Sequence, residues 1–102
     1  MKISLHLISA AASLLFVACP ASAQDAAAVR GMAATCANCH GTDGRSVGTV
    51  QGLAGADKNY LVQQMQDFKA GKRPATIMQQ IAKGFTDTQT EQIAAYFAAQ
   101  KK

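Results

Sequence analysis

The sequence predicts an all-α fold built from about four helices. Apolar residues recur at helical spacing in several stretches, and no stretch shows the apolar–polar alternation of a β-strand. Glycines and a proline separate these stretches, as is typical of helix ends. The chain has 102 residues, and we expect a secretory signal peptide in residues 1–23 followed by one domain in residues 24–102.

Three features of the first residues predict the signal peptide. Lys2 gives a positive start, an apolar stretch runs from residue 5 to 18, and Ala21-Ser22-Ala23 is a small-residue cleavage site. The apolar stretch is shorter than the roughly 20 residues that span a bilayer. Cys19 weakly resembles a lipoprotein processing site, but an intact cleavage site follows it. We therefore expect an exported, periplasmic protein without a transmembrane segment.

The first helix of the mature chain is expected to begin at Asp25, a residue type that caps helices. Its inward face would carry Val29, Met32, Ala33 and Cys36, which follow helical spacing.

Residues 41–55 are rich in glycine and lack periodicity, which predicts a tightly folded loop. The glycine spacing matches neither a dinucleotide-binding fingerprint nor a P-loop. Nucleotide binding is therefore not expected of this segment.

The second helix is expected to begin after Asp57 and to end at Gly71. Its inward stripe would be Leu61, Met65 and Phe68.

Two capping boxes predict the remaining helices. Thr76 with Gln79 would open a short helix that runs through Lys83, and Thr86 with Gln89 would open the C-terminal helix. The C-terminal helix has an apolar face made of Ile93, Tyr96 and Phe97. We expect this face to cross the first helix.

The run Cys36-Ala37-Asn38-Cys39-His40 is the attachment signature of c-type haem. Cys36 and Cys39 can each form a thioether with one haem vinyl group, and His40 then lies under the iron as the proximal ligand. Zinc would need about four ligands, and the mature chain has no further Cys or His. A thioredoxin-type redox pair would need a βαβ scaffold, and a plain disulfide would leave His40 without a role.

The sixth iron position could be filled by a methionine, since Met/His ligation is typical of cytochromes c. Met32 precedes Cys36 by one turn on the same helix and cannot easily reach the opposite haem face. Met65 shares a helical stripe with apolar neighbours, where methionine usually packs. Met78 follows a proline-containing loop far enough along the chain to reach the distal face. Met78 is therefore the predicted distal ligand.

Ligation of the iron by both His40 and Met78 predicts an electron carrier rather than an enzyme, and the charges and polar residues give no sign of a catalytic site. The formal net charge is +4, with no long basic cluster, so nucleic acid is not an expected partner. A mildly basic surface suits docking on acidic proteins, and plain solubility explains it equally well. The acidic residues fit helix caps and solvated faces, and we find no acid–base pair or activated nucleophile. A haem sensor or peroxidase would need an open sixth position.

Several segments of the mature chain resemble class I cytochromes c of the small bacterial periplasmic type. They are Cys36–His40, Gly52–Gly55, Tyr60-Leu61, Phe68–Gly71, Ile77-Met78, Gly84–Asp87 and Ala94–Phe97. The resemblance implies four or so helices around one covalent haem c, with thioethers at Cys36 and Cys39 and axial ligation by His40 and Met78. The resemblance also implies a small residue, Ala28 or Gly31, where the first helix crosses the last helix against Tyr96. The tryptophan that bonds a haem propionate in mitochondrial-type relatives is missing, so Tyr60 or Arg45 would have to take that role.

The stretches Thr76–Met78 and Ile81–Phe85 more narrowly resemble the haem subunit of flavocytochrome c sulfide dehydrogenase. This resemblance implies a partnership with an FAD-containing flavoprotein that oxidises sulfide and passes electrons to the haem. The alternative is a free monohaem cytochrome c that shuttles electrons between respiratory or photosynthetic complexes.

Overall fold

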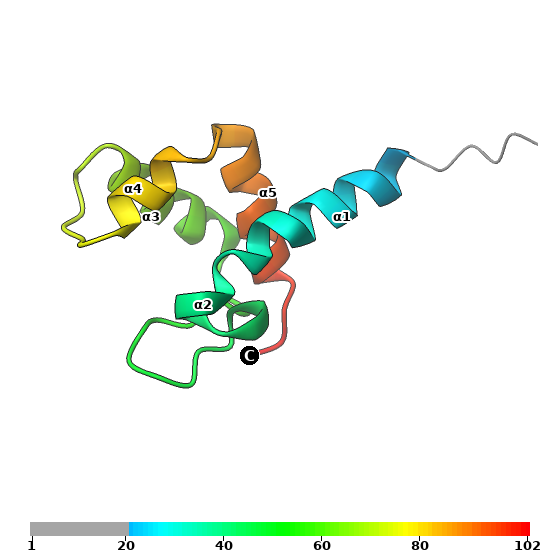
Figure 1. Cartoon of the computed structure of the whole chain (residues 1–102), viewed down its shortest axis with the longest axis horizontal. Coiled ribbons are helices and arrows are strands. Elements are labelled where there is room, and N and C mark those ends of the chain that lie inside the picture. Colours follow the sequence, from blue (N-terminus) through cyan, green and yellow to red (C-terminus); the bar gives the residue numbers. More distant parts are fainter. Residues whose placement is uncertain (1–20) are drawn as a thin grey trace, which may run out of the picture.

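The chain, as a computed structural model, is described over residues 21–102 and is helical, with no strand among those residues. The elements in order are α1 (Ala21–Ala34), α2 (Ala37–His40), the 3-10 turn η1 (Thr42–Gly44), α3 (Lys58–Lys69), α4 (Met78–Lys83) and α5 (Asp87–Ala98). Figure 1 shows their arrangement. The predicted all-α fold is confirmed, and the additional short helix α2 lies within the Cys36–His40 motif. Most of the predicted leader, including Cys19, lies outside the described residues.

The first helix begins before the predicted position. Because α1 starts at Ala21, Asp25 lies inside the helix and does not cap it, so this prediction was wrong. Processing at the predicted cleavage site would remove the first turn of α1. At its other end the helix closes with a tight turn, in which the Cys36 amide donates to the Ala33 carbonyl at 3.1 Å. This turn joins α1 to the haem-attachment motif, whose first residue is Cys36.

The core forms where α1, α3 and α5 meet, and α1 and α5 lie against each other although they stand at opposite ends of the described chain (Figure 1). Its buried residues are Ala33, Leu61, Ile93, Ala94 and Phe97. The predicted contact between the first and last helices is confirmed. Its small residue is Ala33, because Ala28 and Gly31 are exposed.

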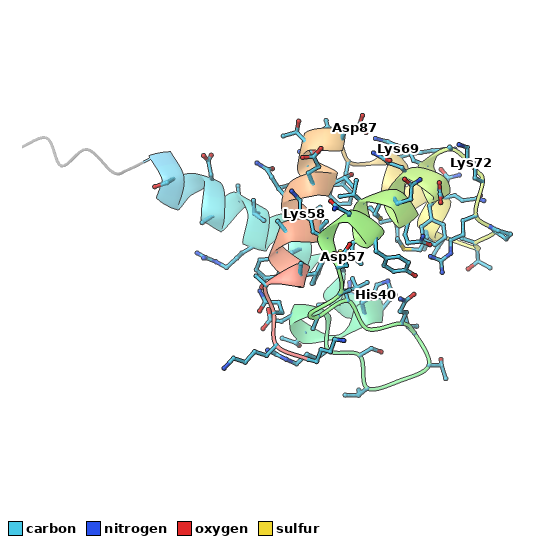
Figure 2. The ribbon with its side chains drawn as sticks, turned by 180° about the vertical axis from the view of Figure 1, so that it is seen from behind. His40, Asp57, Lys58, Lys69, Lys72 and Asp87 are labelled. Carbon is cyan, nitrogen blue, oxygen red and sulfur yellow. The ribbon has the colours of Figure 1, made fainter. Side chains whose placement is uncertain are left out.

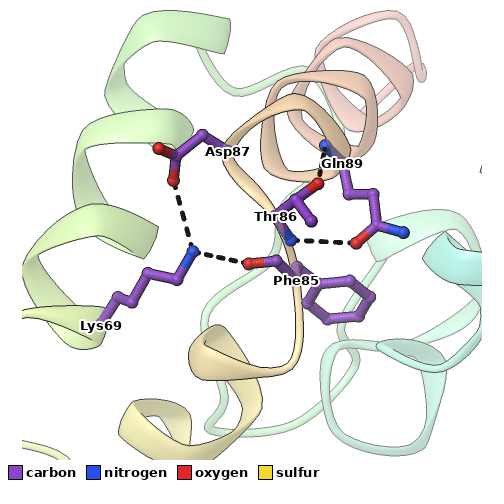
Figure 3. A network of polar contacts seen from close by, with 5 residues as sticks. All are labelled: Lys69, Phe85, Thr86, Asp87 and Gln89. Carbon is purple, nitrogen blue, oxygen red and sulfur yellow. Dashed lines mark hydrogen bonds and ion pairs between the residues drawn. The ribbon is translucent and has the colours of Figure 1, made fainter.

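Two of the predicted helix starts are confirmed. The Asp57 side chain accepts a hydrogen bond from the Tyr60 amide at 2.9 Å, which caps α3. Thr86 and Gln89 form a reciprocal capping box at the start of α5, with bonds of 3.1 and 2.9 Å (Figure 3). Both caps satisfy backbone amides that have no partner within the helix.

The predicted capping box of α4 is absent. Ile77 occupies the cap position without a side-chain bond, and Gln79 instead donates to the Arg73 carbonyl at 3.3 Å. The connection that follows α4 is held by Lys69, which donates to the Phe85 carbonyl at 2.6 Å and pairs with Asp87 at 3.3 Å (Figure 3). Tertiary contacts rather than a local cap therefore hold this short helix.

Candidate functional site

The two cysteines stand on one helical turn in different environments. Cys36 is half-buried and packs against the core, whereas Cys39 is exposed, and both are free thiols. Burial raises the pKa of the Cys36 thiol, and a hydrogen bond with Thr35 partly opposes this rise. The turn is closed by the His40 amide, which donates to the Cys36 carbonyl at 2.9 Å. The chain therefore presents two unpaired thiols and an imidazole from one short segment.

The ring of His40 is oriented by a backbone contact. Its Nδ1 lies 2.6 Å from the Gln51 carbonyl oxygen. A carbonyl oxygen can only accept, so in the neutral ring Nδ1 carries the proton and Nε2 keeps its lone pair. This arrangement is typical of histidines that bind a metal through Nε2, since a bond to the other ring nitrogen sets the tautomer and orientation.

The loop after His40 is folded tightly upon itself by two glycines with positive φ. Gly41 has φ of 82°, and a Cβ there would lie 2.3 Å from the Arg45 carbonyl oxygen. Gly44 has φ of 77°, and its carbonyl accepts from the amides of Leu53 and Ala54 at 2.8 and 3.1 Å. This folding brings Gln51 back to His40.

Asp43 links this loop to the C-terminal helix, a contact that the sequence did not predict. Tyr96 donates to Asp43 Oδ1 at 2.6 Å, and Arg45 lies 3.5 Å from Asp43 Oδ2. Arg45 also donates from Nε to the Lys101 carbonyl at 2.9 Å. The bond to Asp43, with a smaller effect of burial, raises the pKa of Tyr96. Among the predicted propionate partners, Arg45 is thus engaged with other groups, and the Tyr60 side chain is exposed.

The three methionines of the described chain occupy three different elements. Met32 packs against the core from α1, and Met65 is half-buried on α3. Met78 is the first residue of α4, half-buried, and follows the exposed Ile77. Of these three, Met78 is therefore the one at the junction of a loop and a helix.

The residues fit a covalently attached haem. The attachment motif supplies two thiols and an imidazole, and Met78 would add a thioether, which together would make a set of side chains that holds haem c. Large apolar side chains are also exposed on the segments that carry this set: Val47 and Val50 in the loop that binds His40, and Ile77 beside Met78. An apolar macrocycle could cover such side chains. In the part of the chain that the structure describes, no group of three or more His, Cys, Asp and Glu side chains could hold a bare metal ion.

A separate surface hollow of about 420 Å³ lies between α1 and α5. It is lined by Ala26, Val29, Arg30, Gln92, Ala95 and Tyr96. None of the cysteines, His40 or Met78 contributes to it. The hollow is therefore distinct from the attachment motif.

A model of the cytochrome c family matches residues 25–101. The chain belongs to the cytochrome c family. This cytochrome c binds haem c covalently through Cys36 and Cys39. The haem supplies a single-electron redox centre, while Gln51, Gly41 and Gly44 hold the loop and the His40 ring in place. No helix in residues 21–102 is long and apolar enough to cross a membrane.

Three curated relatives show how far the similarity extends. Cytochrome c4 of Pseudomonas aeruginosa is 44% identical over 81 residues, which are 78% of this chain and 40% of that protein. The cytochrome subunit of sulfide dehydrogenase from Chlorobaculum tepidum is 41% identical over 63 residues, 62% of this chain and 57% of that subunit. Cytochrome c-554(548) of Halomonas halodenitrificans is 35% identical over 83 residues, covering 78% of this chain and all of that protein.

The fold agrees with a solved relative. The structure of cytochrome c4 from Acidithiobacillus ferrooxidans superimposes with a TM-score of 0.60 at 42% identity, over 63% of this chain and 37% of the other. This cytochrome c thus spans about half or less of the length of the cytochrome c4 and sulfide dehydrogenase relatives. The predicted class I cytochrome c fold is confirmed.

Proposed function

We propose that His40 and Met78 are the axial ligands of the haem iron and that the protein is a monohaem electron carrier. The observation that carries this proposal is the bond from His40 Nδ1 to the Gln51 carbonyl, which leaves Nε2 unprotonated for iron. Met78 is the methionine at the start of a short helix after a loop, and a thioether is the usual partner of histidine in electron-transfer cytochromes.

Ligation on both faces suits outer-sphere electron transfer. A neutral thioether raises the reduction potential and closes the iron to oxygen and other small molecules. The protein is then not an enzyme by itself, and its residues serve to hold the haem and to set its potential. A peroxidase or sensor would show an open sixth position instead.

The cleavable leader predicted in residues 1–23 supports export to the periplasm. We place the cytochrome domain in residues 24–102, a range that includes the family match of residues 25–101. The similarity to the Halomonas cytochrome, which is covered over its whole length, supports a carrier role for a domain of this size. Its electron donors and acceptors would be other redox proteins.

The similarity to the Chlorobaculum subunit favours a second candidate role. In this role the chain is the haem subunit of a sulfide dehydrogenase and accepts electrons from an FAD-containing flavoprotein. Catalysis would then belong to the partner.

Replacing Met78 with alanine tests the ligation. In the haem-loaded protein, Met78→Ala should abolish the weak red absorption of the ferric iron–thioether bond, lower the reduction potential and allow carbon monoxide to bind the ferrous iron. Met65→Ala is the matched control, because Met65 is also a half-buried methionine and should leave all three properties unchanged. Unchanged spectra and potential in Met78→Ala would refute the assignment.

Size-exclusion chromatography of a native periplasmic extract separates the two roles. Haem that elutes at the size of the single domain would support the free carrier. Co-elution of haem with flavin and with sulfide-dependent haem reduction, at a much larger size, would establish the subunit role.

A further inference from the structure

The segment between α3 and α4 carries the chain from Gly71 to Met78, and it is folded back onto α3. Gly71 has φ of 74°, which allows the chain to reverse directly after the helix. The amides of Lys72 and Arg73 then both donate to the Asp67 carbonyl, at 2.8 and 3.3 Å. This connection therefore returns along α3 before it reaches Met78.

Arg73 joins α3 to the start of α4. Its guanidinium carbon lies 4.7 Å from the centre of the Phe68 ring, and its Nη1 donates to Gln64 Oε1. Its carbonyl oxygen accepts from Gln79, the residue after Met78, at 3.3 Å. One residue thus bonds to α3 through its side chain and to α4 through its backbone.

The start of α4 depends on such contacts. The helix has only six residues and no side-chain cap, and helices this short are not stable on their own. Its C-terminal side is followed by Phe85, whose carbonyl is bonded by Lys69 (Figure 3). At the end that carries Met78, the hydrogen bond from the Gln79 side chain to the Arg73 carbonyl holds the helix.

We propose that Arg73 is a positioning residue for Met78. By stacking on Phe68 and accepting from Gln79, it holds the first turn of α4 against α3 and thereby keeps the methionine sulfur on the iron. This proposal rests on the proposed ligation by Met78. The loss of Arg73 should let Met78 leave the iron more readily without unfolding the rest of the domain.

The test measures how tightly imidazole displaces the methionine from ferric haem, followed by loss of the red iron–thioether absorption. Arg73→Ala should bind imidazole about tenfold more tightly than the wild type, a difference of about 1.4 kcal/mol. Gln79→Ala should shift the affinity in the same direction, and Arg73→Lys should recover part of the loss because a cation still reaches the Phe68 ring.

Two controls separate positioning from charge and from general stability. Lys72→Ala removes an adjacent positive charge from an exposed side chain (Figure 2) and should leave the imidazole affinity unchanged. Thr86→Ala weakens α5 without touching the start of α4 and should also leave it unchanged.

Three outcomes would count against the proposal. It is overturned if Arg73→Ala matches Lys72→Ala, or if Thr86→Ala raises the affinity as much as Arg73→Ala does. Should Arg73→Ala fail to fold, an unchanged affinity in Gln79→Ala would overturn it. A wild-type protein without the red absorption would instead refute ligation by Met78 itself.

Discussion

Replacing Gly44 with alanine should destabilise the protein strongly, because Gly44 is buried in the loop that presents Gln51 to His40. A Cβ at this position would lie 2.8 Å from the Ala54 amide nitrogen and 2.8 Å from a ring carbon of Phe97. Its φ of 77° also lies in the region that non-glycine residues avoid. The left-handed conformation costs about 1–2 kcal/mol and overpacking about 1–3 kcal/mol, so we expect a loss of about 2–5 kcal/mol.

Guanidinium unfolding of the haem-loaded protein, followed by far-ultraviolet circular dichroism, measures this loss. Gly31→Ala is the matched control, since Gly31 lies in α1 and a Cβ there would meet no neighbouring group within 4 Å. That control should be neutral or should stabilise the protein by up to about 1 kcal/mol, because alanine favours helix. If Gly44→Ala unfolds at the same denaturant concentration as Gly31→Ala, the steric reasoning fails.

Two further predictions concern hydrogen bonds. Tyr96→Phe should lower the free energy of unfolding by about 1 kcal/mol at neutral pH, through loss of the bond to Asp43. Because the pKa of Tyr96 is raised in the folded state, this contribution is complete below the ordinary tyrosine pKa of about 10 and is lost as the pH rises through the higher folded value, so the two proteins should converge in strongly alkaline solution. Thr86→Ala should cost about 1 kcal/mol in the same assay and Thr86→Ser much less, since serine keeps the capping oxygen; equal losses would contradict the capping role.

The helix starts that sequence predicted correctly are those set by local chemistry. Asp57 and the pair Thr86 and Gln89 bond to backbone amides within three residues, so the pattern alone contains the interaction. The similar pair Thr76 and Gln79 fails because Gln79 finds a tertiary partner, the Arg73 carbonyl. A capping pattern in the sequence does not reveal that a distant carbonyl will compete for the side chain of Gln79.

The candidate site likewise combines residues that the sequence predicted with contacts that it could not predict. The haem-attachment residues Cys36 and Cys39 follow from a contiguous motif, and their role is confirmed by the family match. The carbonyl of Gln51 and the bond from Tyr96 to Asp43 could not be predicted, because each joins residues distant in the chain through the fold of the loop. The axial roles of His40 and Met78 remain predictions.

The packing of α1 against α5 has a consequence for how the cofactor can be joined. Ala33 is buried among Ile93, Ala94 and Phe97, and Cys36 packs against the same cluster. This part of the core therefore closes only when α5 docks. While α5 is undocked, the Cys36 thiol lacks these apolar neighbours, so both thiols are accessible to haem before the core closes.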